Sequence, residues 1–94
     1  MPNRQRPVRI IGDGLAWQGP CLLTGIIFVP DANDDYVDVY DGRDATTGEK
    51  VCRVKTATKT TLHLYFGSGI YFDGGIYLDG YDAAVETTVL FTPV

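Results

Sequence analysis

The sequence predicts an all-β fold, a small antiparallel β-sandwich of jelly-roll type with about seven or eight short strands. The chain of 94 residues is rich in β-branched and aromatic side chains and has 11 glycines and 5 prolines. No long apolar stripe has a helical period, and turn-forming residues interrupt the chain at short intervals. A single domain of this size buries only roughly 60–65% of its unfolded surface, so we expect association to stabilise it.

One segment in the first half of the chain has the pattern of a core strand. Two short apolar runs, 7–11 and 15–17, come first and are separated by glycine turns. Cys21–Val29 is apolar at both alternating positions, as in a central strand that is covered on both faces. Gly25 within it indicates a bulge or a close backbone approach.

Four later segments alternate strictly between apolar and polar residues, which is typical of half-buried antiparallel strands. They are residues 35–41, 50–56, 62–66 and 85–92. In the second of them Arg53 and Lys55 point outward, where we expect them to pair with Asp38 and its neighbours on the preceding strand.

The segment between the last two of these strands contains an internal near-repeat. Residues 69–74 are GIYFDG, and residues 75–80 are GIYLDG. Each copy is a short β-prone run bounded by glycines that can adopt positive φ, so we expect a tight strand-turn-strand unit. Two copies are too few for a solenoid.

Charge is distributed unevenly along the chain. Arg4, Arg6 and Arg9 lie in the first ten residues, and the other 84 residues carry 5 basic and 12 acidic side chains, a balance of −7. We expect residues 1–14 to form a basic arm and a first short strand, and residues 15–94 to form one sandwich domain. The arm is either a solvated terminus or a segment that orders on an acidic neighbouring subunit. The acidic body argues against nucleic-acid binding, and neither a membrane span nor a signal peptide is expected.

Two cysteines, Cys21 and Cys52, fall in separate predicted strands. Free cysteine packs as a small apolar residue, so two buried thiols are expected, while a disulfide remains open if the strands are neighbours. With one histidine and no Cys-x-x-Cys motif, neither a zinc site nor any other cofactor is expected.

The chain has few groups that could carry out catalysis. His63 and Ser68 are its only histidine and serine, and they sit in a strand and the turn after it, where structural roles are expected. The acidic loop of Asp31, Asn33 and Asp35 lacks the glycine and glutamate that an EF-hand loop requires, so it is interpreted as a turn, with a weak surface Ca²⁺ site as the alternative. No catalytic or metal-binding residue is predicted.

Aromatic side chains are the stronger candidates for a binding surface. Trp17, Tyr36, Tyr40, Tyr71 and Tyr77 could pack on cross-strand neighbours, anchor a subunit interface, or stack on sugar rings while nearby aspartates accept bonds from hydroxyls. We predict that they form a subunit interface or a ligand face.

Several loose motifs follow one another between Gly19 and Pro93. In order they are Gly19-Pro-Cys-Leu-Leu-Thr-Gly25, Val39-Tyr-Asp-Gly42 with Thr47-Gly48, Gly69-Ile-Tyr-Phe72, Gly75-Ile-Tyr-Leu-Asp79 and Thr88-Val-Leu-Phe-Thr-Pro93. Together they resemble the small β-sandwich virion proteins of tailed bacteriophages. The resemblance implies a protein that decorates capsids or forms head fibres or spikes, often as a trimer, and it brings no catalytic residue.

The sequence thus predicts a non-enzymatic structural virion protein, a capsid decoration or cement protein made in the host cytoplasm. Its partners would be the major capsid protein and further copies of itself, with a trimer favoured, and Arg4, Arg6 and Arg9 would contact the outer shell. The alternative is a fibre or tail-tip module that recognises host surface glycans through its tyrosines. A hydrolase or metal-dependent enzyme that uses His63 and aspartates is the least favoured reading.

Overall fold

The structure is a computed structural model that describes residues 5–94, and it consists of eight β-strands. Among these residues there is no helix that is long and apolar enough to cross a membrane. The strands are β1 (Arg6–Ile11), β2 (Asp13–Gln18), β3 (Cys21–Val29), β4 (Tyr36–Asp41), β5 (Glu49–Lys55), β6 (Leu62–Phe72), β7 (Gly75–Gly80) and β8 (Glu86–Pro93).

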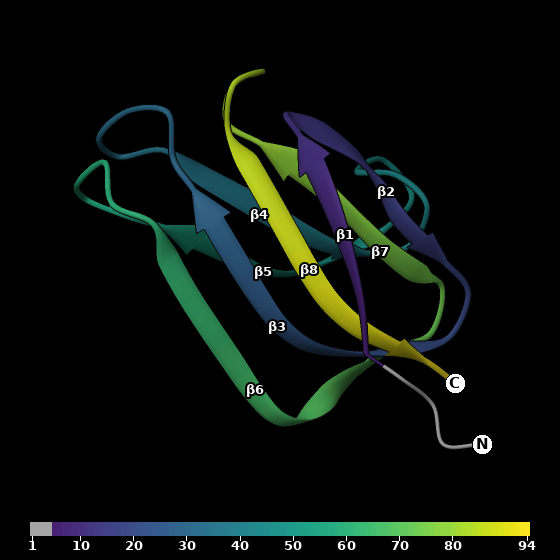
Figure 1. Cartoon of the computed structure of the whole chain (residues 1–94). Coiled ribbons are helices and arrows are strands. Elements are labelled where there is room, and N and C mark those ends of the chain that lie inside the picture. The colour runs from purple at the N-terminus through teal and green to yellow at the C-terminus, as the bar shows by residue number, and fades with distance from the viewer. Residues whose placement is uncertain (1–4) are drawn as a thin grey trace.

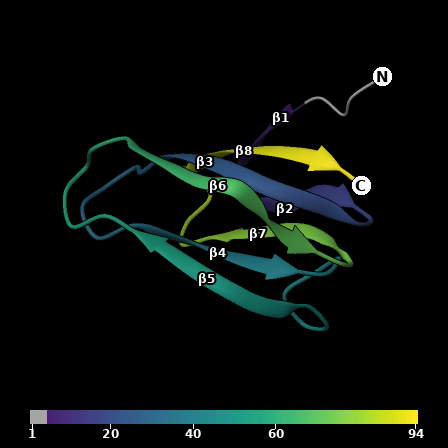
Figure 2. The same cartoon turned by 90° about the horizontal axis from the view of Figure 1, so that it is seen from below.

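The strands form two four-stranded antiparallel sheets that face each other (Figures 1 and 2). The order is β1-β8-β3-β6 in the first sheet and β2-β7-β4-β5 in the second. The first strand therefore pairs with the last, the second with the seventh, the third with the sixth and the fourth with the fifth. This is the strand order of a jelly roll, and the predicted antiparallel sandwich is confirmed.

The core fills the space between the sheets and is almost entirely apolar. Alternate residues of the strands point into it, as the sequence pattern predicted for residues 35–41 and 85–92. Its buried members are Cys21, Leu23, Ile26, Phe28, Val37, Val39, Val54, Phe72, Ile76, Leu78, Val85, Val89 and Phe91.

Strand β3 lies between β8 and β6, and it contains the bulge predicted at Gly25. Its register with both neighbours shifts between Leu23 and Gly25. We expected this strand to be covered on both faces, and this is wrong for its outer face. The inner face is fully buried, but Leu22 and Ile27 on the outer face are only half-buried, because a jelly roll has two layers and nothing in the described chain covers the outside of this sheet.

The two copies of the near-repeat do form consecutive strands, but in different sheets. The first copy is the end of β6, and the second is β7 in the opposite sheet, so the turn at Asp73 and Gly74 carries the chain across the sandwich. The strand expected to end at Phe66 continues as β6 to Phe72. It bends at a wide irregularity, where the register with β3 moves from Tyr65 directly to Ile70 (Figure 1).

The sandwich begins earlier than residue 15. Strand β1 pairs along its whole length with β8, from Arg6 opposite Phe91 to Ile11 opposite Glu86. Arg6 to Gly14 are therefore part of the two sheets, and only the segment before Gln5 lies outside the described residues.

Both cysteines are free thiols. Cys21 is buried on β3, whereas Cys52 is half-buried on β5 in the opposite sheet. Facing sheets lie about 10 Å apart, which exceeds the Cα separation that a disulfide spans. Burial, with a smaller effect of the Asp41 charge, raises the pKa of the Cys21 thiol to about 11.

The start of β7 requires glycine, which yields a test of the fold. Gly75 has φ +138°, and a Cβ there would collide with the Trp17 carbonyl oxygen and lie 3.1 Å from Gln18 Cα. Gly67 also has positive φ, at +61°, but no atom lies within 4 Å of the added Cβ. Gly67→Ala should cost only the backbone strain of about 1–2 kcal/mol. Gly75→Ala should cost clearly more, because two backbones must separate.

Urea denaturation of both variants measures this difference. Equal losses of unfolding free energy would contradict the close backbone approach of β7 to β2.

Candidate interaction surfaces

Three of the five predicted aromatic residues share one surface. Tyr36 and Tyr40 on β4 and Tyr77 on β7 project from the outer face of the second sheet, because Val37, Val39, Ile76 and Leu78 take the alternate inward positions. Tyr81, which directly follows β7, joins them. We call these four tyrosines the tyrosine face.

The rings of the tyrosine face pack in two pairs. Tyr40 and Tyr77 are directly opposite in register, with ring centroids 6.4 Å apart in an edge-on arrangement. Tyr36 and Tyr81 have centroids 4.9 Å apart, and the Tyr81 amide donates a hydrogen bond of 2.8 Å to the Tyr36 carbonyl. Such pairs stabilise the sheet and present a firm aromatic surface.

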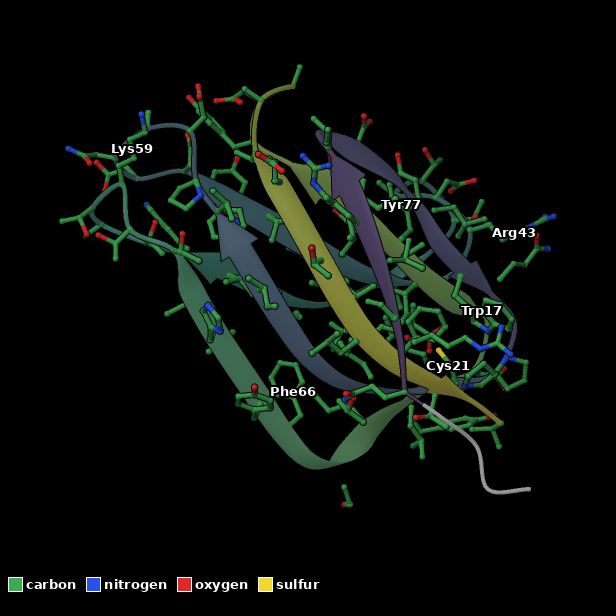
Figure 3. The ribbon with its side chains drawn as sticks, viewed as in Figure 1. Trp17, Cys21, Arg43, Lys59, Phe66 and Tyr77 are labelled. Carbon is green, nitrogen blue, oxygen red and sulfur yellow. The ribbon has the colours of Figure 1, made fainter. Side chains whose placement is uncertain are left out.

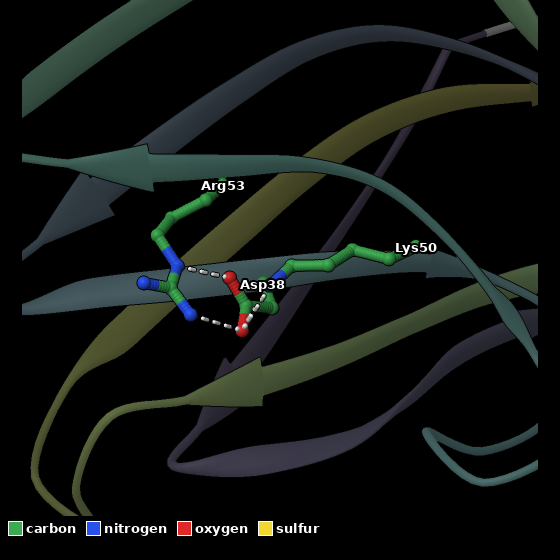
Figure 4. Close-up of polar contacts among 3 residues, drawn as sticks. All are labelled: Asp38, Lys50 and Arg53. Atoms are coloured by element: carbon green, nitrogen blue, oxygen red, sulfur yellow. Dashed lines mark hydrogen bonds and ion pairs between the residues drawn. The ribbon is translucent and has the colours of Figure 1, made fainter.

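A nearly buried carboxylate lies beside these rings. Asp38 is only 6% exposed although it points outward, because two cations from β5 cover it (Figure 4). Arg53 Nε and Nη2 donate to the two carboxylate oxygens over 2.7 and 3.1 Å, and Lys50 Nζ lies 3.2 Å from Oδ2. The Arg53 guanidinium also lies 3.8 Å from the centre of the Tyr36 ring.

The predicted cross-strand pairing is therefore confirmed for Arg53, which is directly opposite Asp38. Lys55 is opposite Tyr36, the outward-facing neighbour of Asp38, so its cross-strand partner is a ring and not a carboxylate. The second cation is Lys50, brought into reach by a register shift between Val39 and Tyr40 that strict alternation does not reveal.

The two cations determine how Asp38 titrates. Burial by itself would raise the pKa of the carboxyl group, but the hydrogen bonds and charges of Arg53 and Lys50 outweigh it and hold the pKa below the usual 3.8. Asp38 is therefore ionised at neutral pH and is a stable anion within the tyrosine face.

Carboxylates continue from Asp38 across the sheet. Asp79 on β7 is opposite Asp38, and Asp13 on β2 is opposite Asp79. The Tyr77 hydroxyl donates to Asp13 over 3.4 Å. Burial and the charge of Asp13 raise the pKa of Tyr77, so its hydroxyl remains a hydrogen-bond donor at neutral pH. Aromatic rings beside carboxylate acceptors can bind a polyhydroxylated ligand.

The other two predicted aromatic residues lie elsewhere. A register shift between Leu15 and Trp17 in β2 turns Trp17 inward, where its ring lies 5.4 Å from that of Phe91 (Figure 3). Tyr71 is exposed on β6 in the first sheet and donates a hydrogen bond of 3.2 Å to Asp73. Neither residue belongs to the tyrosine face.

Two of the three arginines of the expected arm are held on the sandwich. The Arg6 guanidinium lies 5.5 Å from the centre of the Trp17 ring. Arg9 Nε donates to the Glu86 carboxylate over 2.7 Å, from the outer face of the first sheet. Arg4 lies outside the described residues. Of the three arginines, Arg6 and Arg9 are therefore held in place along β1, and we call these two residues the basic edge.

The acidic loop is organised differently from the expected trio. Asp31 and Asp35 lie with Asp82, from the loop before β8, and one oxygen of each carboxylate lies within 4.8 Å of the others. The Asn33 side chain instead accepts a hydrogen bond of 2.7 Å from the Lys59 amide. The buried Asp35 carboxylate accepts bonds from the amides of Asp31 and Ala32, which favours a structural role. The three carboxylates could still offer oxygen ligands to a hard cation such as Ca²⁺.

The candidates for nucleophilic chemistry are both on the surface. His63 is exposed on the outer face of β6, and Ser68 is exposed in the irregular segment that interrupts this strand.

The comparisons with known proteins do not assign a family. No family model matches the chain, and no curated protein sequence is significantly similar to it. The surfaces described above are therefore the basis for a functional proposal.

The Asp38 ion pairs give a pH-dependent prediction. The folded pKa of Asp38 is lowered, so its contribution to stability is complete above the unfolded value of 3.8 and is lost as the pH falls through the folded value. Asp38→Asn should lower the free energy of unfolding by about 1–3 kcal/mol at pH 7, because two cations lose a charged partner. The difference from the wild-type protein should shrink below about pH 4.

Urea denaturation at pH 7 and at low pH measures both values. Asp79→Asn is the matched control, since it removes a like charge opposite Asp38 and should leave stability unchanged or slightly higher. An Asp38→Asn loss that is independent of pH would contradict the ionic role.

Proposed function

We propose that the protein is a non-enzymatic structural virion protein of a bacteriophage, which binds the outside of the capsid shell as a small homo-oligomer. The observation that carries the proposal is the outer face of the first sheet. Its central residues are apolar and only half-buried, and they are Leu22, Ile27, Val29 and Leu90. We call this surface the apolar face.

Neighbouring residues extend the apolar face. Ile11 on β1 is 56% exposed, and Tyr65 on β6 is 77% exposed. These apolar side chains share the outer face with Thr24, Thr88 and Glu86, and exposed apolar residues gathered on one face of a small soluble domain favour a protein-protein interaction site. A sandwich of this size gains stability when such a surface is covered in an assembly.

A basic edge flanks the apolar face. Arg9 projects from β1 beside it, with a side chain that is 60% exposed despite its ion pair with Glu86. Arg6 lies at the end of the same strand but on its inner side, opposite Phe91 and over the Trp17 ring, so Arg9 is the cation that borders the apolar face directly. An apolar centre with a cationic rim fits an acidic protein shell, because the cations contribute electrostatic attraction while the apolar residues contribute burial.

The jelly-roll strand order and the resemblance of the ordered motifs to small phage virion proteins support the same proposal. Jelly rolls are used in viral capsids and also in lectins, so the fold is compatible with a shell-binding and with a glycan-binding role. The major capsid protein is the proposed partner, and the capsid surface is the proposed location.

Substitution of the basic edge tests the proposal. Deletion of residues 1–9 would remove most of β1, so Arg6→Gln with Arg9→Gln is the cleaner change. The double variant should bind undecorated, expanded shells roughly tenfold more weakly, because exposed charge contacts contribute up to about 1 kcal/mol each. Co-sedimentation with shells from the same source measures the affinity.

Lys59→Gln is the matched control, since Lys59 is an exposed cation at the far end of the sandwich from Trp17 (Figure 3). It should bind like the wild-type protein. Absence of saturable wild-type binding to shells would overturn the proposal, and equal binding by all variants would exclude the basic edge as the contact.

The tyrosine face favours a second candidate function, recognition of host surface glycans. Its rings, half-buried except for the exposed Tyr81, lie beside the carboxylates of Asp13 and Asp79, an arrangement in which rings can stack on a sugar and carboxylates can accept from its hydroxyls.

Under this second candidate, Tyr40→Ala or Tyr77→Ala should weaken binding to host polysaccharide about tenfold, through loss of one stacking contact. Tyr71→Ala is the control, because Tyr71 is exposed on the opposite sheet. Glycan-array or calorimetric binding measures the effect, and an equal loss in all three variants would contradict a site on the tyrosine face.

A further inference from the structure

The four sheet edges of the sandwich differ in how they are protected from pairing with another chain. An unprotected edge strand presents free backbone N–H and C=O groups, and proteins block such pairing with charged residues, proline or bulges. Strand β1 has Arg6, Pro7 and Arg9, and β5 has both acidic and basic residues at Glu49, Lys50, Arg53 and Lys55. Strand β2 begins with Asp13 and is bulged.

Strand β6 has none of these charges. Its sequence, LHLYFGSGIYF, contains no acidic residue, lysine, arginine or proline over 11 residues. The irregularity between Tyr65 and Ile70 confines the regular pairing with β3 to residues 62–65, and Phe66 directly follows them. We call residues 62–66 the β6 edge (Figure 1).

The side chains of the β6 edge are incompletely buried on both faces. Leu62, Leu64 and Phe66 point toward the core but are only half-buried, because the edge has no neighbour beyond it. His63 and Tyr65 are exposed on the outer face. A further strand beside this edge would bury the first three and contact the other two.

We propose that the β6 edges of two copies of this chain pair antiparallel about a two-fold axis at Leu64, which joins the first sheets into one continuous eight-stranded sheet. In this register Leu62 lies opposite the partner's Phe66, and Leu64 lies opposite the partner's Leu64, both facing the core. His63 lies opposite the partner's Tyr65 on the outer face. Every cross-strand pair is thus apolar or aromatic.

The charge of the chain indicates where on its surface two copies can pair. The net charge is −4, so two copies repel each other on average. The uncharged β6 edge is where they can approach without placing like charges opposite each other. A two-fold axis requires a segment that complements itself, and the order Leu-His-Leu-Tyr-Phe meets this requirement about its central leucine.

This pairing goes beyond the proposed shell binding and does not depend on it. It predicts a dimer, whereas the resemblance to phage proteins implies a trimer, so the mass of the free protein distinguishes the two.

A charge exchange across the axis tests the pairing. In a double variant His63→Lys/Tyr65→Lys, each new cation lies opposite a cation of the partner, and in His63→Glu/Tyr65→Glu each new anion lies opposite an anion. Both variants should be monomers, whereas the wild-type protein is a dimer. An equimolar mixture of the two variants should form a one-to-one heterodimer, because every pair is then oppositely charged.

Native mass spectrometry and light scattering after size exclusion measure the masses. Circular dichroism melts show whether each variant is folded. Formation of the heterodimer in the mixture is a second control, because only folded chains can pair. Tyr71→Lys is the control, since Tyr71 is on β6 but beyond the irregularity, and it should remain dimeric.

A wild-type protein that is monomeric or trimeric would overturn the proposal. So would double variants that stay dimeric, or a mixture that fails to form heterodimers. Tyr65 also extends the apolar face, so shell co-sedimentation is scored for each variant, for their mixture and for Arg9→Gln, which lies away from β6. Mixing restores pairing alone, and Arg9→Gln weakens shell binding alone, so the two losses are distinguished.

Discussion

The core of this sandwich depends on the bulge in its central strand. Before Gly25, strand β3 directs Cys21 and Leu23 into the core. After Gly25 it directs Ile26 and Phe28 into the core, which strict alternation of residues could not do. Both neighbouring strands shift register at the same point, and the Thr24 hydroxyl donates to the Leu90 carbonyl over 3.0 Å. A Cβ at position 25 would lie 3.1 Å from the Leu64 carbonyl oxygen, so glycine allows β6 to approach here. The bulge thus keeps the inner face apolar along all of β3.

The same geometry accounts for the surface of the first sheet. The residues of β3 that do not enter the core form the apolar face, because β3 is apolar at nearly every position and only one side meets the second sheet. Exposed apolar surface on a domain this small is stabilised by assembly, and we have proposed the apolar face and the β6 edge as two contacts, which meet at Tyr65. The proposed shell contact is a face flanked by Arg9 of β1, and the proposed contact with a second copy is a backbone edge.

The second sheet has a different chemistry on its outer side. Its tyrosines pair across β4 and β7, and Asp38 is kept ionised by Arg53 and Lys50 although it is nearly buried. Arg53 serves twice, since it binds the carboxylate and stacks on Tyr36. A firm polar-aromatic surface opposite the apolar face means that the two sides of the sandwich can contact different partners.

The sequence by itself determined where regular strands form and, where alternation is strict as in residues 35–41 and 85–92, which side of the strand is buried, since alternation and glycine positions report local geometry. It predicted the all-β sandwich, the bounds of β3, the bulge at Gly25 and the Asp38–Arg53 pair. Which strands become neighbours was decided only by the tertiary structure, because pairing joins residues far apart in the chain. The near-repeat was therefore predicted as one unit although its copies lie in opposite sheets. For the same reason Tyr81 and Asp82 were missed, Trp17 was expected on the wrong face, and the uncharged β6 strand could not be recognised as a sheet edge.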